Sequence, residues 1–142
     1  MGYRFAIHDD LRLVYKKVWG EYGDAESAES HAEWDALCKA SPEVGDFNEL
    51  QDLTGVTRYH VSLEQIRRLA DRYEAEWETG LHQPKRLAYV VPSAVAFGTG
   101  RVYGALISMT LISFRVFTAL DDAADWLGLD GPQRRRVWQS AR

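Results

Sequence analysis

The chain of 142 residues contains a single cysteine, Cys38, and therefore forms no internal disulfide. Small secreted domains usually depend on several disulfides, so we expect a reducing compartment, the cytoplasm. Residues 1–10 include Arg4, Asp9 and Asp10 and no apolar run, and we expect no secretory signal.

A long uncharged apolar run is also lacking. The longest apolar region extends from Leu87 to Leu120, but Pro92, Arg101, Gly104 and Arg115 interrupt it. No uncharged stretch reaches the roughly 18 residues that suggest a spanning helix. We therefore expect no stable membrane insertion.

Motifs for metal binding and catalysis are missing as well. The four histidines, His8, His31, His60 and His82, lie in separate segments, and the chain has no HExxH or CxxC spacing and no Gly-x-Ser-x-Gly. Metal sites and hydrolase nucleophiles are usually recognised in a sequence by such motifs. We expect no metal, no cofactor and no catalytic residues.

Basic residues are scarce in one part of the chain. Between Glu21 and Asp52 there are ten acidic residues and one basic residue, Lys39. Acidic surfaces repel phosphates, which argues against nucleic acid as a partner. The alternative interpretation is a solvated face of a helix with no partner at all.

Alternating and helical patterns divide the chain into strands and helices. Period-two alternation predicts a hairpin, and two N-terminal signals, Asp24 as an N-cap and a Ser62–Gln65 capping box, predict helix starts. The predicted strands are Phe5–Ile7, Leu11–Trp19, Phe47–Leu53, Leu87–Val91 and Phe114–Phe117. The predicted helices are Asp24–Ala40, Ser62 to Gly80, Ala94–Thr110 and Asp121–Leu127, the last closed by Gly128.

This order predicts an α/β fold with a mixed sheet. An N-terminal antiparallel hairpin is followed by strands that alternate with helices, which favours parallel neighbours. We expect about five strands with about four helices packed on them. Thr54 to Thr57 is expected to lead out of the third strand, and residues 130–142 are expected to form a basic, poorly ordered C-terminal tail.

The predicted helix Ala94–Thr110 is apolar around most of its circumference. It contains no acidic residue and no lysine. Such a helix needs cover on more than one side, and a second copy of the chain would supply it. The predicted homodimer interface is formed by Phe97, Val102, Leu106 and Met109. The alternative is that the C-terminal helix and tail of the same chain cover this helix.

Arg101 is the one charged residue between Leu87 and Phe114. An arginine near a helix start can hold a phosphate or a carboxylate, and Tyr103 could line such a pocket. The alternative is an ion pair with an acid such as Asp52. The Gly98-Thr-Gly-Arg-Val-Tyr103 segment begins like a dinucleotide-binding loop but lacks the third glycine, and close packing of small residues explains it better.

Four segments together resemble the SpoIIAA-like proteins, a STAS-related (STAS/SEC14-like) family. They are Leu11 to Gly20, Asp52 to Thr57, Ala96 to Tyr103, and Phe114 to Phe117 followed by Ala123 to Leu127. The likeness spans residues 3–129 and implies a small sheet with packed helices, frequent dimers and no established enzyme activity. True anti-sigma-factor antagonists carry an Asp-Ser-Ser-Gly phosphoacceptor motif where this chain reads Asp52-Leu-Thr-Gly, so only Thr54 could take that role.

These observations give three hypotheses. The first is a non-enzymatic regulatory or protein-interaction domain, as a homodimer. The second is a domain that binds or senses a small apolar or anionic, lipid-like ligand near Arg101, with Tyr103, Asp52 and Thr54 as further site residues. The third is an enzyme that uses Asp52 and Arg101, and it is the weakest because the sequence shows no nucleophile beside a base.

Overall fold

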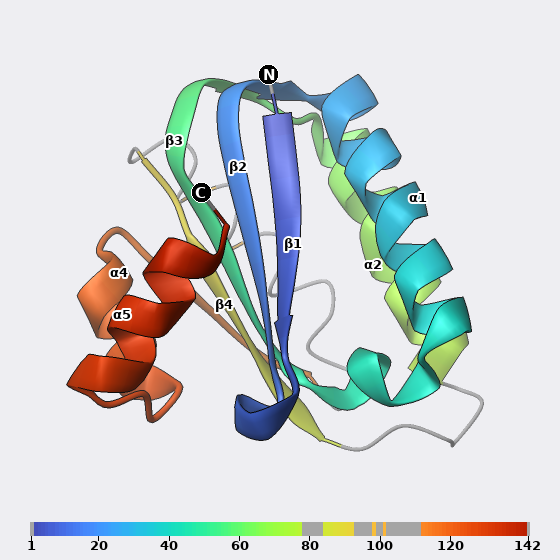
Figure 1. Ribbon diagram of the computed structural model, residues 1–142. Coiled ribbons are helices and arrows are strands. Elements are labelled where there is room, and N and C mark those ends of the chain that lie inside the picture. Colours follow the sequence, from blue (N-terminus) through green and yellow to red (C-terminus); the bar gives the residue numbers. More distant parts are fainter. Residues whose placement is uncertain (1, 78–83, 93–97, 99–100, 102–111, 142) are drawn as a thin grey trace.

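A five-stranded sheet forms the centre of the computed structural model, which describes residues 2–77, 84–92, 98, 101 and 112–141 (Figure 1). Strand β1 pairs antiparallel with β2, and β2 to β5 are parallel to one another. The strands are β1 (Gly2–His8), β2 (Leu13–Gly23), β3 (Asn48–His60), β4 (Lys85–Val90) and β5 (Ile112–Phe117), side by side in chain order. The predicted mixed sheet is confirmed.

Helices cover both faces of this sheet (Figure 1). On one face lie α1 (Asp24–Ala40) and α2 (Leu63–Trp77), and on the other α4 (Leu120–Trp126) and α5 (Gly131–Ser140). Two short 3-10 turns, η1 (Asp9–Leu11) and η2 (Pro42–Asp46), lead into β2 and β3. The central strands are therefore enclosed between two helical layers.

Burial on both sides explains the sequence of β2. Leu13 and Tyr15 pack in the cluster that includes Val137 of α5, whereas Val14 packs with Trp34 of α1. Because successive side chains of a strand point to opposite faces, a strand covered on both faces buries all of them. Lys16, only 3% exposed, is buried with its apolar neighbours.

Strands β2 and β3 are longer than predicted. They continue to pair with each other from Trp19 and Gly55 to Gly23 and His60, past register shifts after Lys17 and Gly20. The expectation that Thr54 to Thr57 leads out of the strand is therefore wrong. At the far end, a Cβ on Gly23 would come within 2.1 Å of the His60 ring, so any other residue there would have to displace this side chain.

The start of α1 differs from the prediction in one respect. The helix spans Asp24–Ala40 as predicted, but Gly23 occupies the N-cap position, and its N–H donates to Glu26 Oε2 over 3.0 Å. The Asp24 carboxylate instead accepts hydrogen bonds from the N–H and the hydroxyl of Ser62, both over 2.7 Å. These bonds lower the pKa of Asp24 and join the starts of α1 and α2.

Ser62 precedes α2, as predicted, and its Oγ accepts from the N–H of Gln65 over 3.1 Å. The returning half of the capping box is absent here, because the N–H of Ser62 donates to Asp24. Gln65 Nε2 points instead toward Ser27 Oγ of α1, at 3.4 Å. The sequence predicted a cap within α2 alone, but Ser62 and Gln65 also form hydrogen bonds with residues of α1.

The expectation of a poorly ordered tail is wrong. Residues Gly131–Ser140 form α5, which begins with a capping box between Asp130 and Gln133. Val137 is fully buried, and the Trp138 ring lies 5.8 Å from the Tyr15 ring. Arg135 and Arg136 are exposed, whereas Arg134 is mostly buried and pairs with Asp121 and Asp125 of α4. The C-terminal segment is therefore part of the core.

Some of the predicted helix ends can be compared with the structure, and others lie outside the described residues. Gly128, with φ +77°, follows α4 as predicted. The predicted end of α2 at Gly80 lies outside the described residues, as does the predicted helix Ala94–Thr110 apart from Gly98 and Arg101. Among the helices described, none combines the length and the apolar composition needed to cross a membrane.

Replacement of Val137 tests the role of α5. Val137→Ala removes two buried methyl groups and is expected to lower the free energy of unfolding by about 2 kcal/mol, measured by urea denaturation. Gln139→Ala, on the exposed side of the same helix, is the control and should leave stability within about 0.5 kcal/mol of the parent. Equal effects of the two substitutions would show that α5 does not stabilise the sheet.

Candidate functional site

Two of the residues predicted as ligand contacts, Asp52 and Thr54, lie together on β3. Asp52 is 2% exposed, and its Oδ1 accepts from the N–H of Thr54 over 3.0 Å and from the Thr54 hydroxyl over 2.6 Å. Its Oδ2 accepts from the hydroxyl of Tyr15 on β2 over 2.5 Å. The carboxylate is thus held by three donors of its own chain.

Tyr15 can only donate in this arrangement. Burial, together with the hydrogen bond to Asp52, raises the pKa of its hydroxyl above the usual range, so the proton stays on tyrosine. Thr54 is exposed, but its hydroxyl proton is committed to Asp52. This cluster joins β2 to β3 beneath α5 and exposes no carboxylate to a ligand.

Of the other predicted site residues, the structure describes Arg101 alone. Arg101 is exposed. The Asp52 carboxylate forms its hydrogen bonds with Tyr15 and Thr54. These bonds give no support to the alternative prediction, an ion pair between Arg101 and Asp52. Tyr103 and the predicted interface residues Phe97, Val102, Leu106 and Met109 lie outside the described residues.

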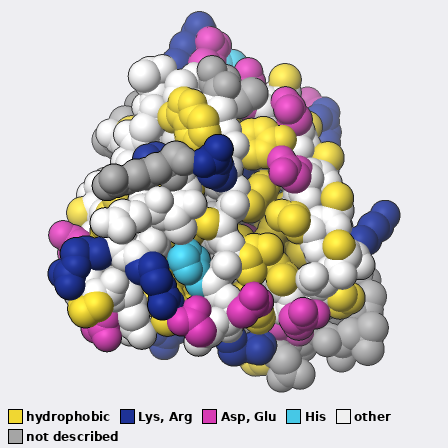
Figure 2. Space-filling view, viewed as in Figure 1, with side chains coloured by type: hydrophobic (Ala, Val, Ile, Leu, Met, Phe, Trp, Pro, Cys, Tyr) yellow, Lys and Arg dark blue, Asp and Glu magenta, His cyan; other side chains and the backbone are white. Residues whose placement is uncertain are grey.

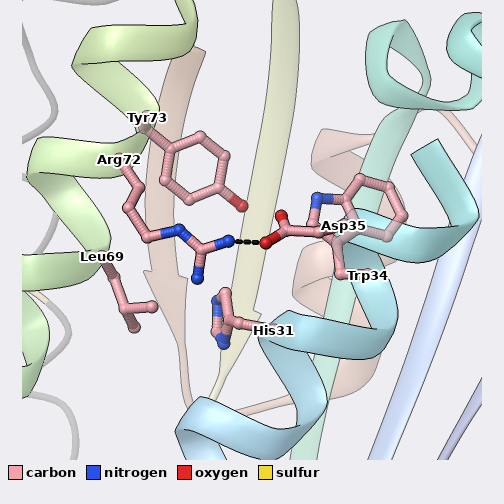
Figure 3. Close-up of a pocket in the computed structure, with 6 residues that line it drawn as sticks. All are labelled: His31, Trp34, Asp35, Leu69, Arg72 and Tyr73. Carbon is pink, nitrogen blue, oxygen red and sulfur yellow. Dashed lines mark ion pairs between the residues drawn. The ribbon is translucent and has the colours of Figure 1, made fainter. Parts of the chain in front are cut away.

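A cavity of about 80 Å³ lies on the opposite face of the sheet, between α1 and α2. It is lined by His31, Trp34, Asp35, Leu69, Arg72 and Tyr73. In Figure 3 the side chains from α1 and those from α2 point toward one another across this space. Arg72 and Asp35 form an ion pair from one helix to the other, and both are about half exposed.

The side of α1 that faces the sheet is polar. Its buried residues are Ser27, Ser30, His31 and Trp34, spaced three, four and seven apart as one helical stripe. Beneath them, Lys16 Nζ of β2 donates to Ser30 Oγ over 2.7 Å, and lies over the rings of Phe5 and Tyr22. Within the described residues, Lys16 forms no ion pair with a carboxylate.

His31 connects this polar layer to the cavity. Its Nδ1 lies 2.8 Å from the carbonyl oxygen of Ser27, which can only accept, so Nδ1 carries the proton. Burial first, and then the positive charges of Lys16 and Arg72, lower the pKa of His31 to about 3. The imidazole is therefore neutral at pH 7, with a lone pair on Nε2.

Sequence reasoning missed this second site, although a signal was present. The buried stripe of α1 begins with Ser27, Ser30 and His31. Small polar residues at helical spacing on a helix without an apolar stripe indicate a polar interior. Among the described residues, no group of three His, Cys, Asp or Glu side chains is placed to hold a metal ion.

The architecture is that of a small α/β domain in which an antiparallel hairpin leads into parallel strands. A similar structure is that of an uncharacterized protein of the DUF3478 family from Shewanella loihica PV-4, described as having a SpoIIAA-like fold. The two chains are 18% identical, and the match covers 89% of this chain and 93% of the other, with a TM-score of 0.54. This chain therefore has a SpoIIAA-like fold, as its sequence motifs predicted.

The likeness extends to the fold and carries no activity, because the similar protein is itself described as uncharacterized. No protein-family profile matches this sequence. The comparison with curated proteins found no similar chain. The assignment of function therefore depends on the geometry of the residues described above.

The buried histidine predicts an acid-sensitive fold. Because the pKa of His31 is about 3 in the folded chain and about 6.5 when unfolded, the unfolded state binds the extra proton between these values. Stability is therefore lost as the pH falls below 6.5. Between pH 7.5 and 4.5 we expect the parent to lose about 2–3 kcal/mol more than His31→Gln in urea denaturation. Identical losses in the parent and in His31→Gln would contradict the assignment.

The Asp52 cluster predicts a cost for removing one hydroxyl. Tyr15→Phe keeps the ring but leaves Oδ2 of the buried carboxylate without its donor, and should lower the free energy of unfolding by about 2 kcal/mol. Tyr22→Phe is a matched control, because Tyr22 is equally buried but its hydroxyl has only two contacts at 3.5 Å. A Tyr22→Phe loss as large as that of Tyr15→Phe would contradict a special role of the Asp52 bond.

Proposed function

We propose that this chain is a non-enzymatic regulatory or protein-interaction domain that works as a homodimer in the cytoplasm. The observation that carries the proposal is the internal use of the reactive side chains. Asp52 binds Tyr15 and Thr54, and Lys85 binds Glu49 and the carbonyl oxygen of Gly45. Each of these contacts joins elements of the fold instead of facing a substrate.

The pair of side chains that is most similar to a catalytic pair also supports a non-enzymatic role. Lys16 Nζ lies 2.7 Å from Ser30 Oγ, a pairing that in an open cleft could activate a hydroxyl nucleophile. Ser30 is fully buried, and its hydroxyl donates to the carbonyl oxygen of Ser27. A substrate cannot reach it without unfolding α1. Asp52, the carboxylate expected for an enzyme that also uses Arg101, is equally enclosed.

An interaction role is favoured by the surface. Figure 2 shows hydrophobic side chains gathered over β1 and the adjoining side of α1. Ile7 on β1 is 37% exposed, and Trp19 of β2, which lies against Gly2 of β1, is 40% exposed. Exposed aliphatic and aromatic side chains near a sheet edge are typical of surfaces that meet another protein.

The homodimer is proposed from the sequence between β4 and β5. The segment from Ala94 to Thr110 contains no acid and no lysine. It is joined to the buried Val90 and Val91 on one side and to the buried Ile112 on the other. A segment of this composition, tied at both ends to the core, favours burial against a second copy through Phe97, Val102, Leu106 and Met109.

Charge supports the exclusion of nucleic acid as a partner. The solvent side of α1 carries Glu29 and Glu33, both exposed, and β2 adds the exposed Glu21. Such a face repels a phosphate backbone. The single cysteine, Cys38, supports the cytoplasm.

The alternative function is the binding of a small anionic or lipid-like ligand near Arg101. It is favoured by the exposure of the Arg101 side chain, which leaves its charge accessible. Tyr103, Asp52 and Thr54 are the other residues proposed for this site. Thr54 is exposed and Asp52 is buried, so Thr54 is the member of this pair that such a ligand would contact.

Native mass spectrometry of the purified chain tests both functions together. We expect the mass of a dimer, and a shift to monomer in Leu106→Asp, because a buried carboxylate opposes association. Leu63→Asp is the matched control, since Leu63 is 62% exposed and lies on α2 outside the predicted interface. A monomeric parent at tens of micromolar would refute the homodimer.

The same spectra discriminate the alternative. A bound small molecule that is retained by the parent and lost in Arg101→Gln would favour ligand binding near Arg101. An empty dimer in both proteins would favour the interaction domain. Circular dichroism confirms that each variant is folded before it is compared.

A further inference from the structure

We propose that the cavity between α1 and α2 is a binding site for a small neutral molecule that donates one hydrogen bond to Nε2 of His31. Arg101 is not among the residues that line this cavity, and the proposal does not depend on whether the chain dimerises. Its ligand class follows from three properties of the described residues: an acceptor without a partner in the protein, charges of both signs, and a wall that is aromatic and aliphatic in part.

The acceptor is the clearest of these properties. His31 is 7% exposed and lines the cavity, and its imidazole projects from α1 toward Arg72 and Leu69 of α2 (Figure 3). Nδ1 donates to the carbonyl oxygen of Ser27, which leaves Nε2 as an acceptor. Among the described residues Nε2 has no hydrogen-bond partner. An acceptor that opens into a cavity takes a hydrogen bond either from water or from the polar group of a ligand.

The charges around the cavity select against ions. Lys16 lies beneath His31, and Arg72 lies beside it, and both positive charges oppose a cation just as they oppose protonation of the imidazole. The half-exposed carboxylate of Asp35 pairs with Arg72 and offsets its charge, which weakens the attraction for an anion. The neutral imidazole offers an anion no proton. A neutral O–H or N–H donor is the chemistry that remains.

The walls of the cavity set the shape of the ligand. Trp34 and Tyr73 contribute aromatic rings from the two helices, and Leu69 contributes an aliphatic side chain. A closed apolar cavity of about 150 Å³ holds benzene. A cavity of about 80 Å³ with an open mouth accommodates the polar end and part of a small ring, while the rest lies between the two helices. Phenol has this combination of donor, apolar body and size.

Two-dimensional NMR titration of the full chain at pH 7.5 tests the proposal with three probes. Phenol supplies the donor, toluene has nearly the same shape without it, and benzoate carries a negative charge. We expect saturable shifts of the Trp34 indole and the His31 ring signals with phenol. Toluene should bind about three- to tenfold more weakly, because Nε2 would stay unsatisfied. Benzoate should bind more weakly than phenol as well.

Two variants locate the effect. His31→Leu removes the acceptor and should abolish the preference for phenol over toluene, whereas His60→Leu, at an exposed histidine of β3, should keep it. If His31→Leu does not fold, the comparison of phenol with toluene on the parent chain still decides. Equal affinities for these two probes, no saturable binding of phenol, or shifts confined to residues outside α1 and α2 would each overturn the proposal.

Discussion

The enclosure of β2 and β3 between two helical layers is the constraint on which the rest of the structure depends. Leu13 to Lys16 of β2 and Glu49 to Leu53 of β3 are buried on both faces, so every polar side chain that the sequence places there must find a partner inside the chain. Lys16 meets Ser30 on the α1 side, Asp52 meets Tyr15 and Thr54 on the α5 side, and Glu49 meets Lys85. Residues with the chemistry of an active site thereby become part of the framework.

The same constraint gives the α1–α2 layer its polar character. The two helices are joined by Asp24 with Ser62, by Gln65 with Ser27, and by the Arg72–Asp35 pair. Hydrogen bonds fix direction more strictly than apolar contacts do, so they hold the helices at defined positions while leaving space between them. The cavity beside His31 is therefore a consequence of how these helices are joined, as well as a place for a ligand.

Much of the fold could be predicted from local patterns, because alternation in β2 and the Ser62 start of α2 are properties of neighbouring residues. The lengths of β2 and β3 could not, since their outer halves are stabilised by pairing with each other and lack a strong pattern of their own. Asp24 was predicted as the N-cap of α1, but its carboxylate binds Ser62 at the start of α2. This partner could not be foreseen because it lies 38 residues away in the sequence. The contact between Asp52 and Thr54 could be predicted because the two residues are neighbours in the sequence, whereas a cavity between two helices that are distant in the sequence could not.

The C-terminal helix was missed because its buried residues, Val137 and Ala141, are separated by charged and polar ones.

The strand order also bears on where this fold can hold a ligand. In doubly wound α/β proteins the order of strands reverses within the sheet, and the loops diverge at that switch point to open a crevice. Here each strand lies beside its predecessor from β1 to β5, so the sheet that the structure describes has no reversal. The carboxyl ends of its strands are thus not forced apart. The recess beside His31 is accordingly formed by the two helices of one layer and not by diverging strand ends.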